Sequence, residues 1–156
     1  LRHAGYHALN SLRIEKAYRH WSHDITDEDS PLEAGLGFAV KFDKLGGFIG
    51  REALLAQKEQ GLRRQLLQLC LTDPEPLVYH NEPIWRDGEL VGHITSGAYG
   101  HVLGGAVGLG YVKTDTCAGA DAVLEGAYEV EVACERIPAD VSLRPMYDPD
   151  NTRIRI

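Results

Sequence analysis

Hydrophobic residues recur along this chain with the spacing of helices at first and, after residue 61, with the spacing of short strands. Residues 3–20 hold good helix formers after Asn10 and no Pro, which predicts a first helix. Residues 51–60 predict a second helix, which Gly61 closes. Two helices are therefore expected before the change of pattern.

The stretch between these helices predicts one helical turn and one strand. Ser30 has the side chain of an N-cap and Pro31 suits the first helical position, so a short helix is expected up to Ala34. Residues 37–42 are typical of a strand. We therefore expect residues 1–61 to form an α/β segment.

Short strands follow one another in the second part of the chain. They are expected at residues 65–71, 83–86, 89–95, 107–113, 128–133 and 136–143. The Asp87-Gly88 pair between two of these runs is a strong hairpin signal. Because no helix is expected among these strands, an antiparallel barrel or sandwich is predicted over roughly residues 63–143, and the fold class is α+β.

The register of the first helix places a carboxylate among apolar side chains. Ala8 and Leu12 lie at i and i+4, and Glu15 follows at i+7 on the same stripe. A neighbouring strip carries Ile14, Ala17, Tyr18 and Trp21. We therefore expect protein to cover most of this helix.

A carboxylate held on an apolar face can serve a ligand. Its two oxygens accept hydrogen bonds in parallel from a ligand edge with two adjacent N–H donors, such as that of a pterin. The alternative is that Glu15 turns to solvent or pairs with Arg19 at i+4. The pattern alone leaves both interpretations open.

Composition excludes some partners. The formal charge is −7, which gives no broad attraction for nucleic acid or an anionic membrane. Three widely spaced cysteines suggest neither a disulfide framework nor a zinc site, and they fit a reducing, intracellular setting. No apolar run approaches the ~20 residues of a membrane span. Because the chain opens on Leu1 in a helical pattern, we expect it to be a piece of a longer protein.

Other candidate chemistry is weak. His20 and His23 are spaced i+3 without a third ligand nearby in the sequence, so no metal site is predicted. The glycines of residues 97–105 lack the Lys-Ser/Thr ending of a phosphate loop and are interpreted as turns between strands. Cys70 alternates with leucines and is interpreted as a small core residue. No nucleophile elbow is present, and no catalytic residue is assigned.

A set of motifs in order resembles the later half of the folate-binding aminomethyltransferase family, typified by the T-protein of the glycine cleavage system. The motifs are Asn-Ser-Leu-Arg-Ile-Glu-Lys at residues 10–16, Trp21, Asp-Ile-Thr at 24–26, Ser-Pro-Leu-Glu-Ala-Gly-Leu at 30–36, Phe-Ile-Gly-Arg-Glu-Ala-Leu at 48–54, Glu-Pro-Ile-Trp at 82–85, Gly-His-Ile-Thr-Ser-Gly-Ala-Tyr-Gly at 92–100 and Leu-Gly-Tyr-Val at 109–112. The resemblance implies an antiparallel β-barrel of the aminomethyltransferase C-terminal type.

Within that family, the chain looks most like the C-terminal region of dimethylglycine and sarcosine dehydrogenases. The resemblance implies an upstream domain with FAD that oxidises a small N-methyl amine, and a tetrahydrofolate module that captures the one-carbon unit. This chain would be the tail of that module, residues 1–61, followed by a barrel domain, residues 62–156. The family's catalytic aspartate and the flavin site would lie upstream of Leu1, so the chain alone is expected to be inactive.

The resemblance also suggests site residues. Glu15 matches the glutamate that holds the pterin edge, with Arg13 and Ile14 before it in the same motif. Tyr6 matches a tyrosine that contacts folate in the amine dehydrogenases. Lys44 lies where the T-protein has a folate-contacting arginine, and as a point charge it could pair with a folate carboxylate.

Two further expectations follow from the resemblance. The protein would be cytoplasmic in a bacterium and located in the mitochondrial matrix in a eukaryote. The alternative function, of a different class, is a non-catalytic barrel that packs against the catalytic domains and shapes the site or the assembly.

Overall fold

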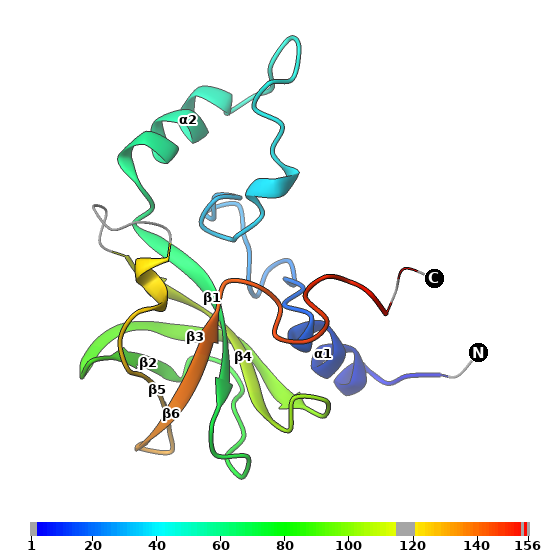
Figure 1. Ribbon diagram of the computed structural model, residues 1–156, viewed down its shortest axis with the longest axis vertical. Coiled ribbons are helices and arrows are strands. Elements are labelled where there is room, and N and C mark those ends of the chain that lie inside the picture. The colour runs from blue at the N-terminus through cyan, green and yellow to red at the C-terminus, as the bar shows by residue number, and fades with distance from the viewer. Residues whose placement is uncertain (1–2, 115–120, 154, 156) are drawn as a thin grey trace.

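A closed antiparallel barrel of six strands forms the centre of the molecule. The computed structural model describes residues 3–114, 121–153 and 155. The strands are β1 (Arg64–Leu71), β2 (Pro83–Arg86), β3 (Glu89–Gly100), β4 (Gly105–Lys113), β5 (Tyr128–Val132) and β6 (Glu135–Ser142) (Figure 1). They are hydrogen-bonded in the order β1-β4-β3-β2-β5-β6, and β1 pairs with β6 to close the ring. The expected barrel is confirmed, and the sandwich alternative is excluded.

Two tight turns set the register of the hairpins. Asp87 and Gly88 both have positive φ, 52° and 85°, as the expected hairpin between β2 and β3 requires. The hairpin between β5 and β6 turns at Ala133 and Cys134, which adopt φ of 51° and 68° without a glycine. The sequence therefore predicted the first turn from its residue types and the second only from its flanking strands.

Apolar side chains fill the barrel and also cover part of its outside. The interior cluster includes Leu67, Leu69, Ile84, Ile94 and Val130, each at most 1% exposed. A second cluster joins helix α1 (Tyr6–Glu15) to β1 and β4 through Ile14, Leu66, Val107, Leu109 and Tyr111. Residues 105–112 of β4 are consequently buried on both faces.

Helix α1 is shorter and less covered than the sequence suggested. It ends at Glu15, and Ala17 has a left-handed φ of 52°, which an α-helix cannot continue through. Its buried residues are Ser11, Ile14 and Glu15, whereas Leu12 is 58% exposed. The prediction of a covered Ala8–Leu12 stripe was wrong, because the helix rests on the barrel along a different face.

The segment between the helices contains a capped turn but no strand. Ser30 Oγ accepts a hydrogen bond from Glu33 N at 3.1 Å, and Ser30 N donates to Glu33 Oε2 at 3.2 Å, which confirms Ser30 as a cap. The prediction of a strand at residues 37–42 was wrong. The chain there begins with a short 3₁₀ turn, η1 (Gly37–Ala39), and no strand of the described residues pairs with it. A second 3₁₀ turn, η2 (Ala122–Leu124), precedes β5.

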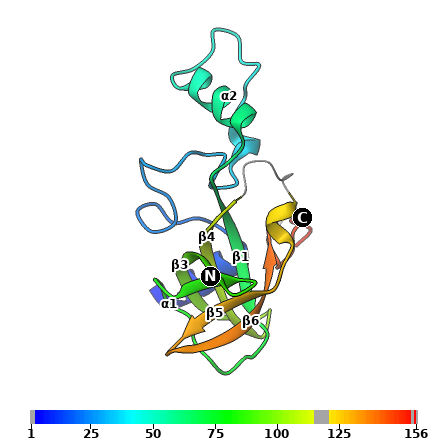
Figure 2. The same ribbon diagram turned by 90° about the vertical axis from the view of Figure 1, so that its left-hand side faces the viewer.

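Residues 37–60 form an arm that extends from the barrel and ends in helix α2 (Arg51–Gln60) (Figures 1 and 2). The predicted helix is confirmed at residues 51–60, with Gly50 at φ 87° before it and Gly61 after it. No residue of η1 or α2 is buried. Phe38, Leu45 and Ile49 are 87%, 98% and 105% exposed, so the arm carries apolar side chains that the described chain leaves uncovered.

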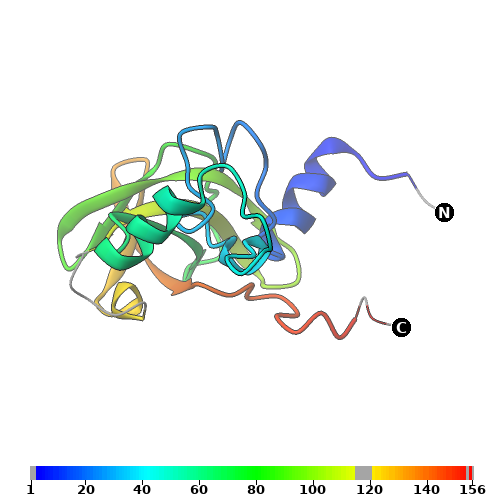
Figure 3. The ribbon, with the colours of Figure 1, turned by 90° about the horizontal axis from the view of Figure 1, so that it is seen from above.

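The C-terminal segment beyond β6 returns along the end of α1 (Figure 3). Tyr147 N donates to the Glu15 carbonyl at 3.3 Å. Lys16 Nζ donates to the Asp148 carbonyl at 2.6 Å and to Asn151 Oδ1 at 2.7 Å. The end of α1 is therefore fixed between the barrel and this segment.

Candidate functional site

A pocket of about 460 Å³ lies between α1, strand β3 and the loop of residues 77–80. Tyr6, Asn10 and Arg13 form its α1 wall. Ser96 and Tyr99 belong to its β3 wall. Ser11 Oγ donates to the Tyr99 carbonyl at 2.6 Å, so a direct hydrogen bond joins the two walls.

The pocket lining is rich in phenol and imidazole rings, although the chain as a whole is acidic. It includes His7, His23, His80 and His101 together with Tyr6, Tyr79, Tyr99 and Arg13. None of the described residues that line it is an Asp or a Glu. The rings of Tyr99 and His101 meet edge to face with centroids 5.2 Å apart. Such a lining suits a flat ligand, because rings can stack on its aromatic side chains.

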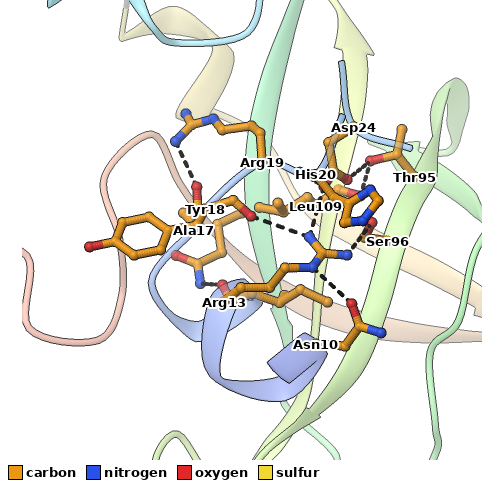
Figure 4. Close-up of polar contacts among 12 residues, drawn as sticks. Asn10, Arg13, Ala17, Tyr18, Arg19, His20, Asp24, Thr95, Ser96 and Leu109 are labelled. Atoms are coloured by element: carbon orange, nitrogen blue, oxygen red, sulfur yellow. Dashed lines mark hydrogen bonds and ion pairs between the residues drawn. The ribbon is translucent and has the colours of Figure 1, made fainter. Parts of the chain in front are cut away.

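Arg13 is held in place by several partners at the base of this pocket (Figure 4). Its Nη1 pairs with Asp24 Oδ2 at 2.8 Å, and its Nη2 donates to Ser96 Oγ at 2.9 Å. Its Nε donates to Asn10 Oδ1 at 2.8 Å. The Arg13 side chain is 12% exposed, so its main partners are protein groups.

Glu15 does not line the pocket and joins α1 to the turn between β3 and β4. It is 1% exposed, and its Oε1 accepts hydrogen bonds from Val102 N at 2.7 Å and Leu103 N at 3.2 Å. The alternative in which Glu15 faces solvent or pairs with Arg19 is therefore wrong. A two-donor ligand edge would have to share Oε1 with the turn, whereas Oε2 accepts no hydrogen bond from the described residues.

The other expected site residues are separated by the fold. Tyr6 and Arg13 line the same pocket. Ile14 is 1% exposed and packs in the outer apolar cluster. Lys44 lies on the arm, where it lines two other hollows with Phe48 and Ile49. The structure thus brings together two of the five expected residues, Tyr6 and Arg13, and buries Glu15 outside the lining of their pocket.

Sequence reasoning missed the polar residues that organise this region. Asp24 is 1% exposed, and its Oδ1 accepts a hydrogen bond from Thr95 Oγ1 at 2.6 Å. Nearby, burial lowers the pKa of the Arg19 guanidinium from its usual value, although the Asp24 carboxylate acts in the opposite direction. Asp24 belongs to the motif at residues 24–26, but it stands in an acidic stretch, so sequence reasoning assigned it no site role and did not mark it as buried.

Two other features, a metal-ligand cluster and a membrane-spanning helix, are absent from the described residues. In that part of the chain, no three His, Cys, Asp or Glu side chains are grouped as metal ligands would be. Nor is any helix among residues 3–114 and 121–153 long and apolar enough to cross a bilayer.

Comparison with known proteins gives two matching family models. One is described as "Glycine cleavage T-protein C-terminal barrel domain" and matches residues 64–148. The other is described as "GCVT N-terminal domain" and matches residues 1–44.

Curated relatives match over nearly the whole chain. The chain is 44% identical to 4-methylaminobutanoate oxidase (formaldehyde-forming) of Paenarthrobacter nicotinovorans, covering 99% of this chain and 18% of that protein. It is 40% identical to mitochondrial sarcosine dehydrogenase of Homo sapiens, covering 97% of this chain and 17% of that protein. This chain therefore spans less than a fifth of the length of these relatives.

A solved structure shares the fold. The glycine cleavage system aminomethyltransferase T from Bartonella henselae superposes with a TM-score of 0.76 at 24% sequence identity, covering 91% of this chain and 38% of that one. The α+β fold expected from the sequence, with its C-terminal barrel, is thereby confirmed.

Proposed function

Because the chain belongs to the glycine cleavage T-protein family, we propose that it is the C-terminal part of a tetrahydrofolate-binding aminomethyltransferase module in an FAD-dependent N-methyl amine oxidase or dehydrogenase. The observation that carries this proposal is the match over nearly the whole chain to oxidases and dehydrogenases of this kind. A 44% identical aminomethyltransferase of Halothermothrix orenii, aligned over 72% of this chain, supports the one-carbon transfer role. The protein would be cytoplasmic in a bacterium and in the mitochondrial matrix in a eukaryote.

The pocket beside α1 fits a reduced folate by its chemistry. The exposed Tyr6 ring offers a face for a flat heterocycle, and no Asp or Glu among the described lining residues would repel the carboxylates that a folate carries. Tetrahydrofolate, when bound, supplies the amines that accept the one-carbon unit. In this proposal the chain positions the folate, and FAD and the amine substrate bind to upstream segments of the same polypeptide.

Each expected site residue has a proposed role in this scheme. Tyr6 packs on the ring system, and Arg13 shapes the base of the pocket. Glu15 offers Oε2 to a ligand N–H while Oε1 holds the turn at Val102. Lys44 pairs with a ligand carboxylate only if the arm and the pocket face one cavity in the longer protein, and Ile14 contributes packing.

A chimera tests folate binding. This chain would replace the matching residues of the Paenarthrobacter oxidase, and 5-formyltetrahydrofolate, a stable reduced folate, would be titrated by calorimetry. We expect Tyr6→Ala to weaken binding by roughly fivefold or more, because stacking on an aromatic ring is lost. We expect the isolated chain to bind more weakly than the chimera, because a site between domains lacks its other walls.

The matched control is Tyr18→Ala, since Tyr18 is 52% exposed and does not line the pocket. Equal losses in the two variants would show that the pocket is not the folate site. Absence of binding to the chimera would show that the chain has no folate role.

The arm supports the second candidate function, a domain-packing role. Its side chains Phe38, Leu45 and Ile49 are almost fully exposed, which is unusual for a chain that remains monomeric. We therefore expect the isolated chain to self-associate, and Leu45→Ser with Ile49→Ser to shift it toward monomer. Sedimentation velocity at several concentrations measures this directly.

Leu77→Ser is the control for this prediction, because Leu77 is 49% exposed on a loop of the barrel. A wild-type chain that is monomeric at every concentration would contradict the expected role of the arm.

A further inference from the structure

Asp24 is a buried carboxylate at a point where three segments of the chain meet. Its side chain is fully buried, and its oxygens accept hydrogen bonds from three directions. Oδ2 accepts from Arg13 Nη1 and from His20 N, each at 2.8 Å, while Oδ1 accepts from Thr95 Oγ1 at 2.6 Å. The carboxylate therefore links α1, the loop after α1 and strand β3 (Figure 4).

Arg13 has its orientation fixed by these contacts. Every guanidinium nitrogen donates: Nε to Asn10, Nη2 to Ser96, and Nη1 to both Asp24 and the Tyr18 carbonyl at 3.2 Å. A planar group with all its nitrogens engaged has a single arrangement, in contrast to a flexible lysine. Of these partners, Asp24 is the one that carries the opposite charge.

A bulge in the sheet directs two hydroxyl groups into this network. The register between β3 and β4 shifts between Ile94 and Ser96. A bulge turns side chains away from strict alternation, and here both Thr95 and Ser96 reach the Asp24–Arg13 pair. Both hydroxyl-bearing residues also line the pocket beside α1.

Asp24 itself does not line the pocket, whereas Asn10, Arg13, Thr95 and Ser96 do. Any effect of Asp24 on a ligand must therefore pass through the residues that it holds. Loss of its charge would leave the Arg13 guanidinium buried without a counter-ion, so Arg13 would move toward water and shift α1 relative to β3.

We propose that Asp24 is a positioning residue that fixes Arg13 and, through it, the α1 and β3 walls of the pocket in a geometry that binds ligand. This proposal rests on the proposed function, because it takes the pocket beside α1 as the folate site. It assigns Arg13 to the architecture of the site, with its charge satisfied by Asp24 rather than by the ligand.

The test compares two buried carboxylates, each changed to its amide. Asp24→Asn removes the charge beside Arg13, and Glu33→Gln removes the charge of a buried carboxylate that pairs with Arg64 at 3.5 Å and lies outside the pocket. Affinity of the chimera for 5-formyltetrahydrofolate would be measured at a temperature at which every variant is folded. Amide hydrogen exchange of α1 and of the barrel strands would be followed in the same samples.

We expect Asp24→Asn to weaken folate binding by about tenfold or more, since a small displacement of positioning groups has a large effect, and Glu33→Gln to leave it unchanged. We also expect α1 amides to exchange faster in Asp24→Asn while the barrel strands stay protected. Arg13→Gln would be measured alone and together with Asp24→Asn. The double variant should bind folate no more weakly than whichever of the two single variants has the lower affinity, because the two residues act as one unit.

Three results would overturn the proposal: equal affinity losses in Asp24→Asn and Glu33→Gln, additive losses in the double variant, or unchanged exchange of α1 in Asp24→Asn. If the unmodified chimera bound no folate, the proposed function would fail. In that case the exchange of α1 would still decide whether Asp24 positions the helix.

Discussion

Replacing Glu15 with alanine is expected to weaken both the fold and folate binding. The carboxylate accepts two backbone hydrogen bonds at Val102 and Leu103 and is 1% exposed. Alanine would leave these N–H groups without their acceptor, at a cost of roughly 2–4 kcal/mol of unfolding free energy. Urea titration measures this loss. Folate affinity of the chimera should fall at least about tenfold, or about 1.4 kcal/mol, while oxidation of the amine by the upstream segment should be nearly unchanged.

Glu15→Gln separates the two roles. A glutamine oxygen can still accept from Val102 N, so most of the stability should be retained. Its NH₂ group would take the position of Oε2 and face the ligand with a donor in place of an acceptor, so folate binding should still weaken. Normal folate affinity in Glu15→Gln, together with low stability in Glu15→Ala, would show that Glu15 only anchors the turn.

Replacing Gly92 with alanine is expected to prevent the barrel from closing. A Cβ atom at this position would lie 1.8 Å from the Tyr111 carbonyl oxygen and 3.1 Å from Val112 Cα. These are backbone atoms of the paired strand β4, so no side-chain rotation can relieve the overlap. In a closed barrel, moving β3 away from β4 also strains the pairs on either side.

The cost is expected to exceed about 4 kcal/mol, a large part of the ~5–15 kcal/mol that stabilises a domain of this kind. Circular dichroism and urea unfolding would show a largely unfolded chain. Gly5→Ala is the control, because a Cβ there meets nothing within 4 Å and the φ of −80° suits any residue. Near-normal stability of Gly92→Ala would mean that β3 and β4 lie further apart than the structure indicates.

Elements with strong local signals were predicted well from the sequence. Helix α2 was placed at residues 51–60 because Gly50 and Gly61 end it and good helix formers fill it. The hairpin at Asp87 and Gly88 was placed because few residue pairs adopt two positive φ angles easily. Strand-like runs between turn signals located the strands, although β3 extends to Gly100 rather than residue 95, and short connections without helices limited the architecture to a barrel or a sandwich.

Elements whose conformation depends on distant contacts were predicted less well. Residues 37–42 have the residue types of a strand, yet the described chain offers them no partner strand. They form η1 and part of the arm instead. The glycines of residues 97–105 were interpreted as turns, but Gly97 and Gly100 lie within β3, where other atoms approach closely. A Cβ at Gly97 would lie 2.4 Å from the Val78 carbonyl oxygen, which only the folded loop brings there.

The sequence by itself determined the family, the α+β class and the presence of Arg13, Ile14 and Glu15 in one motif, because these depend on residue order and local periodicity. Only the tertiary structure decided what each side chain contacts. Asp24 and Thr95 are separated by 71 residues, and Glu15 and Val102 by 87. A buried charge is stable only beside the partners that the whole fold supplies. For that reason the motif at residues 24–26 did not reveal that Asp24 is buried and pairs with Arg13 at 2.8 Å.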